Sequence, residues 1–141
     1  MLVLAIAGLI FLIVFLALPA LQRSQRDTQR KQDLSRFLSQ LTQYQSNHQG
    51  GVPAGATNWS SFVSAYLTNN GASWSDPQKG SYSLTVNASG TTTAPSSTIG
   101  TVTIYQSATC DSSGVPASSS NTRDVAVAMT LEQGGYLCQS N

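Results

Sequence analysis

The chain has 141 residues, enough for one domain of modest size, and only 9% of them are charged. Its net charge of +1 excludes a strong electrostatic field that would recruit nucleic acid or an acidic substrate. The sequence contains no G-x-S-x-G, H-E-x-x-H, P-loop or C-x-x-C motif. The only histidine, His48, lies among polar residues and is expected to be solvated. We therefore predict no enzymatic activity, no catalytic residues, no metal site and no cofactor.

The first segment, residues 1–21, contains no charged, hydroxyl or amide side chain. As a helix it would be about 32 Å long, enough to cross the hydrocarbon core of a bilayer. Leaving its fifteen large apolar side chains in water would cost roughly 1.5 to 3 kcal/mol each. The segment therefore belongs in lipid, in a bundle of helices, or in one after the other. A cleaved secretory signal is the alternative, although the apolar run is longer than usual and no basic residue precedes it.

Residues 22–49 are predicted to continue the same helix as an amphipathic one, ending at Gly50 and Gly51. A helix of nearly fifty residues is about 73 Å long, whereas the remaining residues would form a domain roughly 30 Å across. The first half of the helix is therefore expected to protrude from the domain. The second half should pack on a sheet through apolar residues at the spacing of one helical face, namely Leu34, Phe37, Leu38, Leu41 and Tyr44.

The beginning of this second half holds most of the charge, with five of the seven basic residues at positions 22–36. Its spacing allows three local ion pairs: Arg23–Asp27, Asp27–Lys31 and Asp33–Arg36. We interpret this stretch as a solvated helix surface beside lipid headgroups, and the alternative is a strip that matches acidic groups on neighbouring subunits. The positive-inside rule would place the basic flank in the cytoplasm, in conflict with an external domain, and an upstream basic leader would resolve the conflict.

Residues 50–80 are predicted to form a connector that contains one short helix over 58–70. Thr57 or Asn58 would cap its start, and Gly71 would end it. The apolar face of this helix would consist of Trp59, Phe62, Val63, Tyr66 and Leu67.

Residues 81–141 change to a period of two, which predicts β-strands. The strand candidates are 82–86, 99–105, 125–131 and 136–138, and the Ser/Thr-rich spans 91–98 and 111–121 are expected to be loops that do not pack. One-sided alternation predicts a small antiparallel sheet of about three to four strands, covered on one face by the helix. The predicted fold class is therefore α+β.

The two cysteines, Cys110 and Cys138, are the only pair that could form a disulfide. An apparent export segment and a small domain favour a bridge, and two unrelated buried thiols are the alternative. A bridge would close a loop whose cross-linking stabilises the fold by roughly 3.6 kcal/mol in the chain-entropy model.

This arrangement of a long helix, a connector, a small sheet and a C-terminal cysteine pair resembles the type IV pilin superfamily. The resemblance is closest in MLVLAIAGLI and ALPALQ. It implies that Gly8 and Pro19 bracket the segment that loses helicity in assembled pili, at a spacing longer than usual, and that Cys110 and Cys138 bound the C-terminal disulfide region. The residues expected in a filament core are Leu4, Gly8, Phe11, Leu12, Phe15, Leu16 and Pro19.

The chain departs from the family pattern at its start. Mature pilins begin with an N-methylated phenylalanine and carry a glutamate a few residues in, whereas the first acidic residue here is Asp27. We hypothesise that the start of the mature chain lies upstream of Met1, and an intact-mass measurement would test this.

The resemblance implies a structural subunit, a major pilin, of an extracellular type IV pilus that serves attachment, motility or DNA uptake. Expected partners are identical subunits, a prepilin peptidase, a membrane platform and a cytoplasmic assembly ATPase, with inner-membrane lipid around the subunit before assembly and no direct contact with nucleic acid. The expected location is the cytoplasmic membrane first and the bacterial cell surface after assembly.

Two alternatives remain open. One is a minor pilin or a type II secretion pseudopilin with the same fold. The other is a permanently anchored surface binding module, in which Trp59, Trp74 and Tyr82 would contact a ligand. Independently of these, Asn58 and Asn87 fit the N-glycosylation sequon, and the Ser/Thr-rich loops could carry O-linked glycans.

Overall fold

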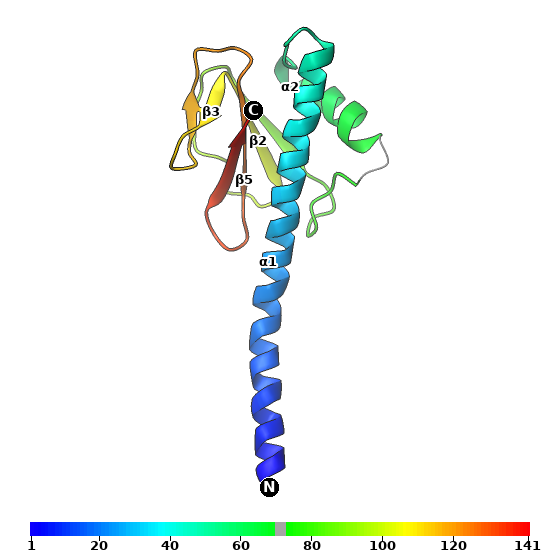
Figure 1. Ribbon diagram of the computed structural model, residues 1–141, viewed down its shortest axis with the longest axis vertical. Helices are drawn as coiled ribbons and strands as arrows, with labels where there is room; N and C mark the ends of the chain where they lie inside the picture. The colour runs from blue at the N-terminus through cyan, green and yellow to red at the C-terminus, as the bar shows by residue number, and fades with distance from the viewer. Residues whose placement is uncertain (70–72) are drawn as a thin grey trace.

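The computed structural model describes residues 1–69 and 73–141. One helix, α1 (Leu2–Asn47), runs through the whole length of the molecule, and the rest of the chain forms a head beside its second half only (Figure 1). The first half of α1 extends away from the head, as its length predicts (Figure 1). The fold class is α+β, as the sequence indicates. The expected helix stop at Gly71 lies outside the described residues.

The helix α1 continues without interruption through Pro19 and ends at Asn47. At its end, the His48 amide donates to the carbonyls of Tyr44 and Gln45, and the Gly50 amide donates to the Gln45 carbonyl at 2.7 Å. Gln49 and Gly50 both have positive φ, which turns the chain away from the helix axis. Glycine adopts this backbone conformation at no steric cost, so the sequence ends the helix here.

The connector forms α2 (Gly55–Phe62), which continues directly as a π-helical segment, η1 (Val63–Thr68). The predicted cap at Thr57 or Asn58 is wrong, because the helix already begins at Gly55 after Ala54. Asn58 instead donates from Nδ2 to the Ala54 carbonyl at 2.8 Å. Polar side chains of this kind can bond the preceding turn as well as cap a helix, so the sequence pattern placed the start too late.

Four strands form the main sheet in the order β1-β2-β5-β6, and their bounds are β1 (Ser83–Asn87), β2 (Thr101–Gln106), β5 (Val125–Thr130) and β6 (Tyr136–Ser140). The pairs β2–β5 and β5–β6 are antiparallel, but β1 and β2 are parallel. The expectation of a purely antiparallel sheet is therefore wrong, and the sheet is mixed. The long connection over 88–100 carries the chain back to the same end of the sheet, which a short hairpin turn could not do.

A second, two-stranded sheet pairs β3 (Ala108–Cys110) with β4 (Pro116–Ser118). Part of the span 111–121 therefore packs, contrary to prediction, and Pro116 is buried. Strands of three residues are too short to show alternation, which explains why the sequence did not reveal them. The predicted disulfide is present and joins Cys110 of β3 to Cys138 of β6, with Cα atoms 5.8 Å apart.

The hydrophobic core lies between α1, α2 with η1, and the main sheet. Leu34, Phe37 and Leu41 have no exposed surface, and Leu38 and Tyr44 are half-buried against the same cluster. Phe37 is central, because its ring lies 5.4 to 5.9 Å from the rings of Phe62, Trp59 and Trp74. Burying an aromatic side chain contributes several times the stabilisation of a surface contact, so this cluster holds the head on α1.

Candidate assembly interface

The first half of α1 is apolar on every side and is not covered by the head. All eight residues from Leu9 to Leu16 are exposed, as are Leu2 and Leu4, each by about three quarters of its surface. This is the only helix among the described residues that is long and apolar enough to cross a membrane. A helix that is apolar all round needs lipid or other helices around it. All the residues predicted for a filament core are exposed on it: Leu4, Gly8, Phe11, Leu12, Phe15, Leu16 and Pro19.

Two residues weaken the helix within this apolar half. A Cβ atom added at Gly8 would meet nothing within 4 Å, so the glycine is not required by the fold of the single chain. Pro19 has no amide hydrogen, and the carbonyl of Phe15 therefore lacks its usual helical donor. Both positions remain helical in the isolated chain.

Above the apolar half, five side chains form a charged collar: Arg26, Asp27, Arg30, Asp76 and Glu132. Arg30 is fully buried, and its guanidinium donates to three carboxylates. It bonds Asp76 through Nε at 2.7 Å and Nη2 at 3.1 Å, and through Nη1 it bonds Glu132 at 2.7 Å and Asp27 at 3.1 Å. A buried cation is stable only when it is paired in this way, so the collar fixes two segments of the head to α1.

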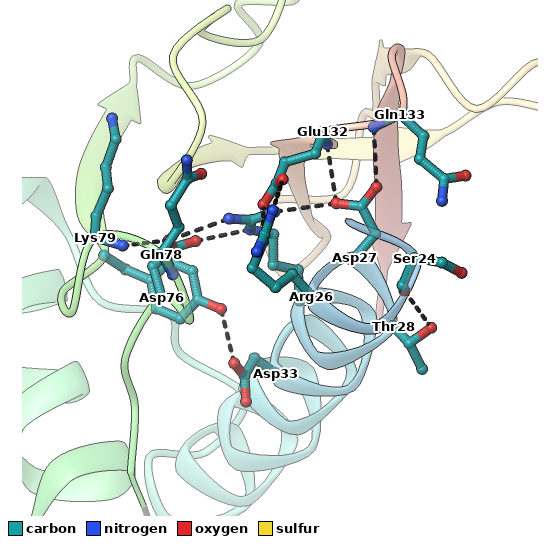
Figure 2. A network of polar contacts seen from close by, with 12 residues as sticks. Ser24, Arg26, Asp27, Thr28, Asp33, Asp76, Gln78, Lys79, Glu132 and Gln133 are labelled. Carbon is teal, nitrogen blue, oxygen red and sulfur yellow. Dashed lines mark hydrogen bonds and ion pairs between the residues drawn. The ribbon is translucent and has the colours of Figure 1, made fainter. Parts of the chain in front are cut away.

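The carboxylates of the collar are also held by other donors (Figure 2). Arg26 bonds both oxygens of Glu132 at 2.7 Å, a bidentate arrangement. Asp27 accepts the backbone amides of Glu132 and Gln133 at 2.9 and 3.1 Å, which brings the turn after β5 against the helix (Figure 2). Asp76 likewise accepts the amides of the two residues that begin its own turn, Gln78 and Lys79.

Gly100 leaves room for the collar. Its φ is +81°, and a Cβ atom there would lie 3.1 Å from the Lys79 side chain and 3.4 Å from the Asp76 carboxyl carbon. A larger residue would combine a strained backbone with a tight contact on the Lys79 side chain. The turn before β2 thus packs directly against Asp76 and Lys79.

The predicted solvated charge surface is wrong for the residues of the collar. Asp27 is 4% exposed and pairs with Arg30, not with Arg23 or Lys31. The predicted Asp33–Arg36 pair is also not made, because Asp33 accepts from the Tyr82 hydroxyl at 2.7 Å and Arg36 donates to the Leu67 carbonyl at 3.1 Å. The head supplies hydrogen-bonding groups from distant positions. Asp33 and Arg36 bind these groups instead of each other, although their spacing on the helix would allow an ion pair.

Hydrogen bonds and ion pairing stabilise the charged forms of Glu132, Asp76 and Arg30 and shift their pKa values accordingly. Hydrogen bonds from Arg26 and then Arg30, against the opposing effect of burial, lower the pKa of Glu132 from 4.5 to about 2. Burial alone would raise the pKa of Asp76, but the Arg30 guanidinium and two backbone amides lower it. Burial alone would lower the pKa of Arg30, and its three carboxylate partners raise it instead. Glu132, Asp76 and Arg30 are therefore charged at neutral pH.

Asp33 and Tyr82 form a separate pair next to the collar. Burial raises the pKa of Asp33, and the hydrogen bond from Tyr82 only partly offsets this effect. Burial and the same hydrogen bond to Asp33 raise the pKa of Tyr82. The ring of Tyr82 also packs 4.7 Å from that of Trp74, so this pair borders the aromatic core.

The residues considered as ligand contacts, and the histidine, do not gather at one site. Trp59 has no exposed surface and packs on Phe37, so it does not face a ligand, whereas Trp74 and Tyr82 are half-buried. His48 is exposed and stacks on Tyr44, with ring centroids 3.9 Å apart. Within residues 1–69 and 73–141, no three potential metal-binding side chains lie together.

The two sequons differ in their surroundings. Asn58 is exposed on α2, while Asn87 is half-buried at the end of β1 and donates to the Thr93 hydroxyl at 3.2 Å. Beyond residue 80 the sequence carries only four charged residues: Asp111, Arg123, Asp124 and Glu132. The surface of the sheet region is therefore almost uncharged, apart from the collar.

The grouping of Arg30, Asp76 and Glu132 could not be recognised from the sequence. The only local signal was the spacing of Asp27 and Arg30, three residues apart on a helix. Glu132 is more than one hundred residues from either arginine and follows a strand with no motif around it. Contacts of such separation leave no periodic pattern in a single sequence.

Comparison with protein-family models, with curated proteins and with solved structures found no match to this chain. The architecture is therefore the basis on which a function can be assigned to it. A long apolar N-terminal helix, a small sheet and a disulfide are compatible with a pilin-like architecture.

Proposed function

We propose that this chain is a structural subunit of an extracellular filament of the type IV pilus kind, which polymerises through the first half of α1. The observation that carries the proposal is the contrast within one helix: residues 2–21 are bare and apolar, whereas the second half is built into the head. No activity on a substrate is required of such a subunit.

The apolar half of α1 needs shelter from water both before and after assembly. Each of its large apolar side chains loses roughly 1.5 to 3 kcal/mol when it is left in water, and a whole domain is stable by only about 5 to 15 kcal/mol. Lipid can shelter this half before assembly, and the same halves of other copies can shelter it afterwards. The transfer replaces one apolar environment by another, so an assembly machine would supply mainly the mechanical step.

Identical subunits that pack with a rotation that does not close form a helical fibre. The apolar halves would form its centre and the heads its outer layer. Partners would be copies of the chain itself and, by resemblance, a prepilin peptidase, a membrane platform and a cytoplasmic assembly ATPase. The subunit would wait in the cytoplasmic membrane and end on the cell surface.

Electron microscopy of surface material sheared from cells tests the proposal, with the subunit identified by peptide mass. We expect long, thin filaments in which this chain is abundant. A filament in which the chain is present only in trace amounts would indicate a minor pilin or a secretion pseudopilin. If the chain remains with the membrane fraction after shearing and no filaments contain it, the anchored binding module would replace the proposal.

A further inference from the structure

A groove of about 340 Å³ lies at the end of α1 that is farthest from the apolar half, where α1 meets α2 and η1 (Figure 1). Four ring-bearing side chains from these segments line it, namely Tyr44, His48, Phe62 and Tyr66. Its volume lies at the lower end of the range for small-molecule sites, about 300 to 1,000 Å³. Tyr44 follows Arg30 of the collar by about 21 Å along the helix axis, so the groove is separate from the assembly interface.

The rings of the groove contact one another in sequence. The His48 ring stacks on that of Tyr44 with centroids 3.9 Å apart, and Tyr44 makes edge contacts at 5.6 Å with both Phe62 and Tyr66. Phe62 is buried in the hydrophobic core, whereas His48 is exposed. Tyr44 covers one face of the imidazole, which leaves the other face open to solvent. The groove thus has an aromatic surface that the core holds in place before any ligand binds.

Three polar groups of the groove are placed to accept hydrogen bonds. Nδ1 of His48 lies 2.9 Å from the Tyr44 carbonyl oxygen, and because a carbonyl cannot donate, Nδ1 carries the hydrogen and Nε2 of the neutral ring is an acceptor. Asn58 and Ser61 each donate to the backbone carbonyl four residues earlier, at 2.8 and 3.1 Å. Each therefore keeps a side-chain oxygen with which it can accept a further hydrogen bond.

The lining of the groove also indicates which ligands do not fit. Among the described residues, no aspartate, glutamate, lysine or arginine lines it, so neither a cation nor an anion would find a countercharge. A purely apolar ligand would leave the three acceptors unpaired. A pyranose ring has C–H groups on its faces, which pack against the electron-rich faces of aromatic rings, and hydroxyls around its edge, which donate to acceptors. The groove therefore fits an uncharged sugar ring.

The backbone of one wall provides an independent observation. Tyr66 and Ala65 belong to η1, whose π-helical turns end where the Asn69 amide donates to the carbonyl of Ser64, five residues earlier, at 3.0 Å. Turns of this kind are rare and occur frequently at functional sites. The irregular segment of the connector thus coincides with the aromatic groove.

From these observations we propose that the groove binds one ring of an uncharged glycan, held against His48, Tyr44 and Tyr66. This site goes beyond the proposed function and does not require it, because each chain carries the complete groove. In a fibre, many copies of a weak site would act together and give tight attachment to a surface that displays the sugar repeatedly.

The test uses the full-length chain in a polyoxyethylene detergent, which carries neither sugar nor charge. Saturation-transfer difference NMR is recorded with the methyl glycosides of galactose, glucose, mannose and N-acetylglucosamine. We expect at least one of the four to receive saturation from the protein and to bind with a Kd of about 1 mM, as suits one small exposed site. If none of the four binds, the proposal is wrong.

Variants of exposed residues locate the site. Ser61→Lys extends a long side chain over the groove and should weaken binding of the sugar at least about tenfold, and His48→Ala, which removes the exposed ring, should do the same. Ser60→Lys is the matched control, because Ser60 is exposed on the same helix and bonds its preceding turn in the same way but does not line the groove. It should bind within about twofold of wild type.

The melting temperature of each variant is measured first, and all three should match wild type because the changed side chains are exposed. Binding that survives in Ser61→Lys would place the sugar elsewhere and overturn the proposal. Tetramethylammonium chloride serves as a rival probe. Saturation of this cation, with no transfer to any sugar, would show that the rings form a cation site and would also contradict the proposal.

The outcomes separate the groove from the proposed function. If the chain forms no filaments but the solubilised chain binds a sugar with this pattern of variants, the glycan site stands and the filament proposal fails. If filaments form and no sugar binds, the glycan site is refuted and the filament proposal is unaffected.

Discussion

The two halves of α1 share one backbone and differ in everything around them. In the first half every large side chain is exposed, whereas in the second half Leu34, Phe37 and Leu41 have no exposed surface at all. Nothing in the backbone marks the change, since the helix runs unbroken from Leu2 to Asn47. A single helix can therefore serve two environments when its side chains are apolar all round in one half and on a single face in the other.

The border between the halves is narrow. Leu21 is 57% exposed and Asp27, less than two turns later, is 4% exposed. The charged collar lies at this border and ties the turn after β5 and the turn before β1 to the helix. The head is thus closed at its lower end by ion pairs and filled above them by aromatic packing. Variants on either side of the border should therefore have separable effects.

The largest effect is expected from a charge in the first half. Leu12→Arg places a cation among apolar neighbours, at a cost of about 2.5 to 3.5 kcal/mol per chain at the centre of a bilayer. We expect complete loss of filaments, measured by electron microscopy of sheared material. The melting temperature of the head should not change, because Leu12 contacts no part of it. Normal filaments in this variant would rule out a buried apolar centre.

The collar is the place where the second half should be most sensitive. Arg30→Ala leaves Asp76, Asp27 and Glu132 without their shared cation, and breaking a buried pair in this way costs about 3 to 5 kcal/mol. The free energy of unfolding, measured by urea denaturation in detergent, should fall by that amount. Arg26→Ala is the matched control, because Arg26 is part-exposed and should have a much smaller effect. Equal stability of the two variants would contradict the role assigned to Arg30.

The disulfide should stabilise the head by a similar or smaller amount. Cys138→Ser opens the bridge to Cys110, and the chain-entropy model gives a loss of about 3 to 4 kcal/mol. We expect a lower melting temperature and lower subunit levels, with the first half of α1 unaffected. The control is the wild-type chain under reducing agent, which should melt at the same temperature as the variant. No shift in either case would show that the bridge does not stabilise the head.

Acidification should produce the smallest of these losses of stability. It should affect only the head and the second half of α1, on which the head packs. The pKa of Glu132 is about 2 in the folded chain and 4.5 when unperturbed, so its contribution is present above pH 4.5 and is lost as the pH falls toward 2. The lowered pKa of Asp76 acts in the same direction, whereas the raised pKa of Asp33 acts in the opposite one. We expect the melting temperature to fall between about pH 5 and pH 2.

Glu132→Gln supplies the comparison for the acid experiment. This variant should be less stable than wild type at pH 7 and should lose less stability on acidification, because one of the two titrating carboxylates is gone. Parallel melting curves for the two proteins across the same pH range would show that Glu132 does not carry the dependence.

The regular parts of the fold could be predicted because their signal is local. The apolar run at 1–21, the helical spacing from Leu34 to Tyr44 and the alternation in 125–131 each impose a period that a sequence displays directly. The cysteine pair could be predicted because only one pairing was available. These features gave the architecture, including the protruding half of α1.

The remaining features depend on contacts between distant positions. The parallel pairing of β1 with β2 follows from the path of 88–100, which has no characteristic pattern, and β4 is too short to show one. The collar was missed because Asp27 has plausible partners four residues away, at Arg23 and Lys31, and local spacing favoured them. The ion pairs of Glu132 and Asp76 with Arg30 can be identified only in the folded structure.

The distribution of charge has a consequence for the behaviour of assembled fibres. Nine of the thirteen charged residues are either in the collar or elsewhere on α1, Lys79 lies next to the collar, and the sheet region adds only Asp111, Arg123 and Asp124. A fibre whose outer layer is made of such heads would present a nearly neutral wall of hydroxyl and amide groups to its surroundings. Lateral association of such fibres, and their attachment to charged materials, would then change little with ionic strength, since there is little for added salt to screen.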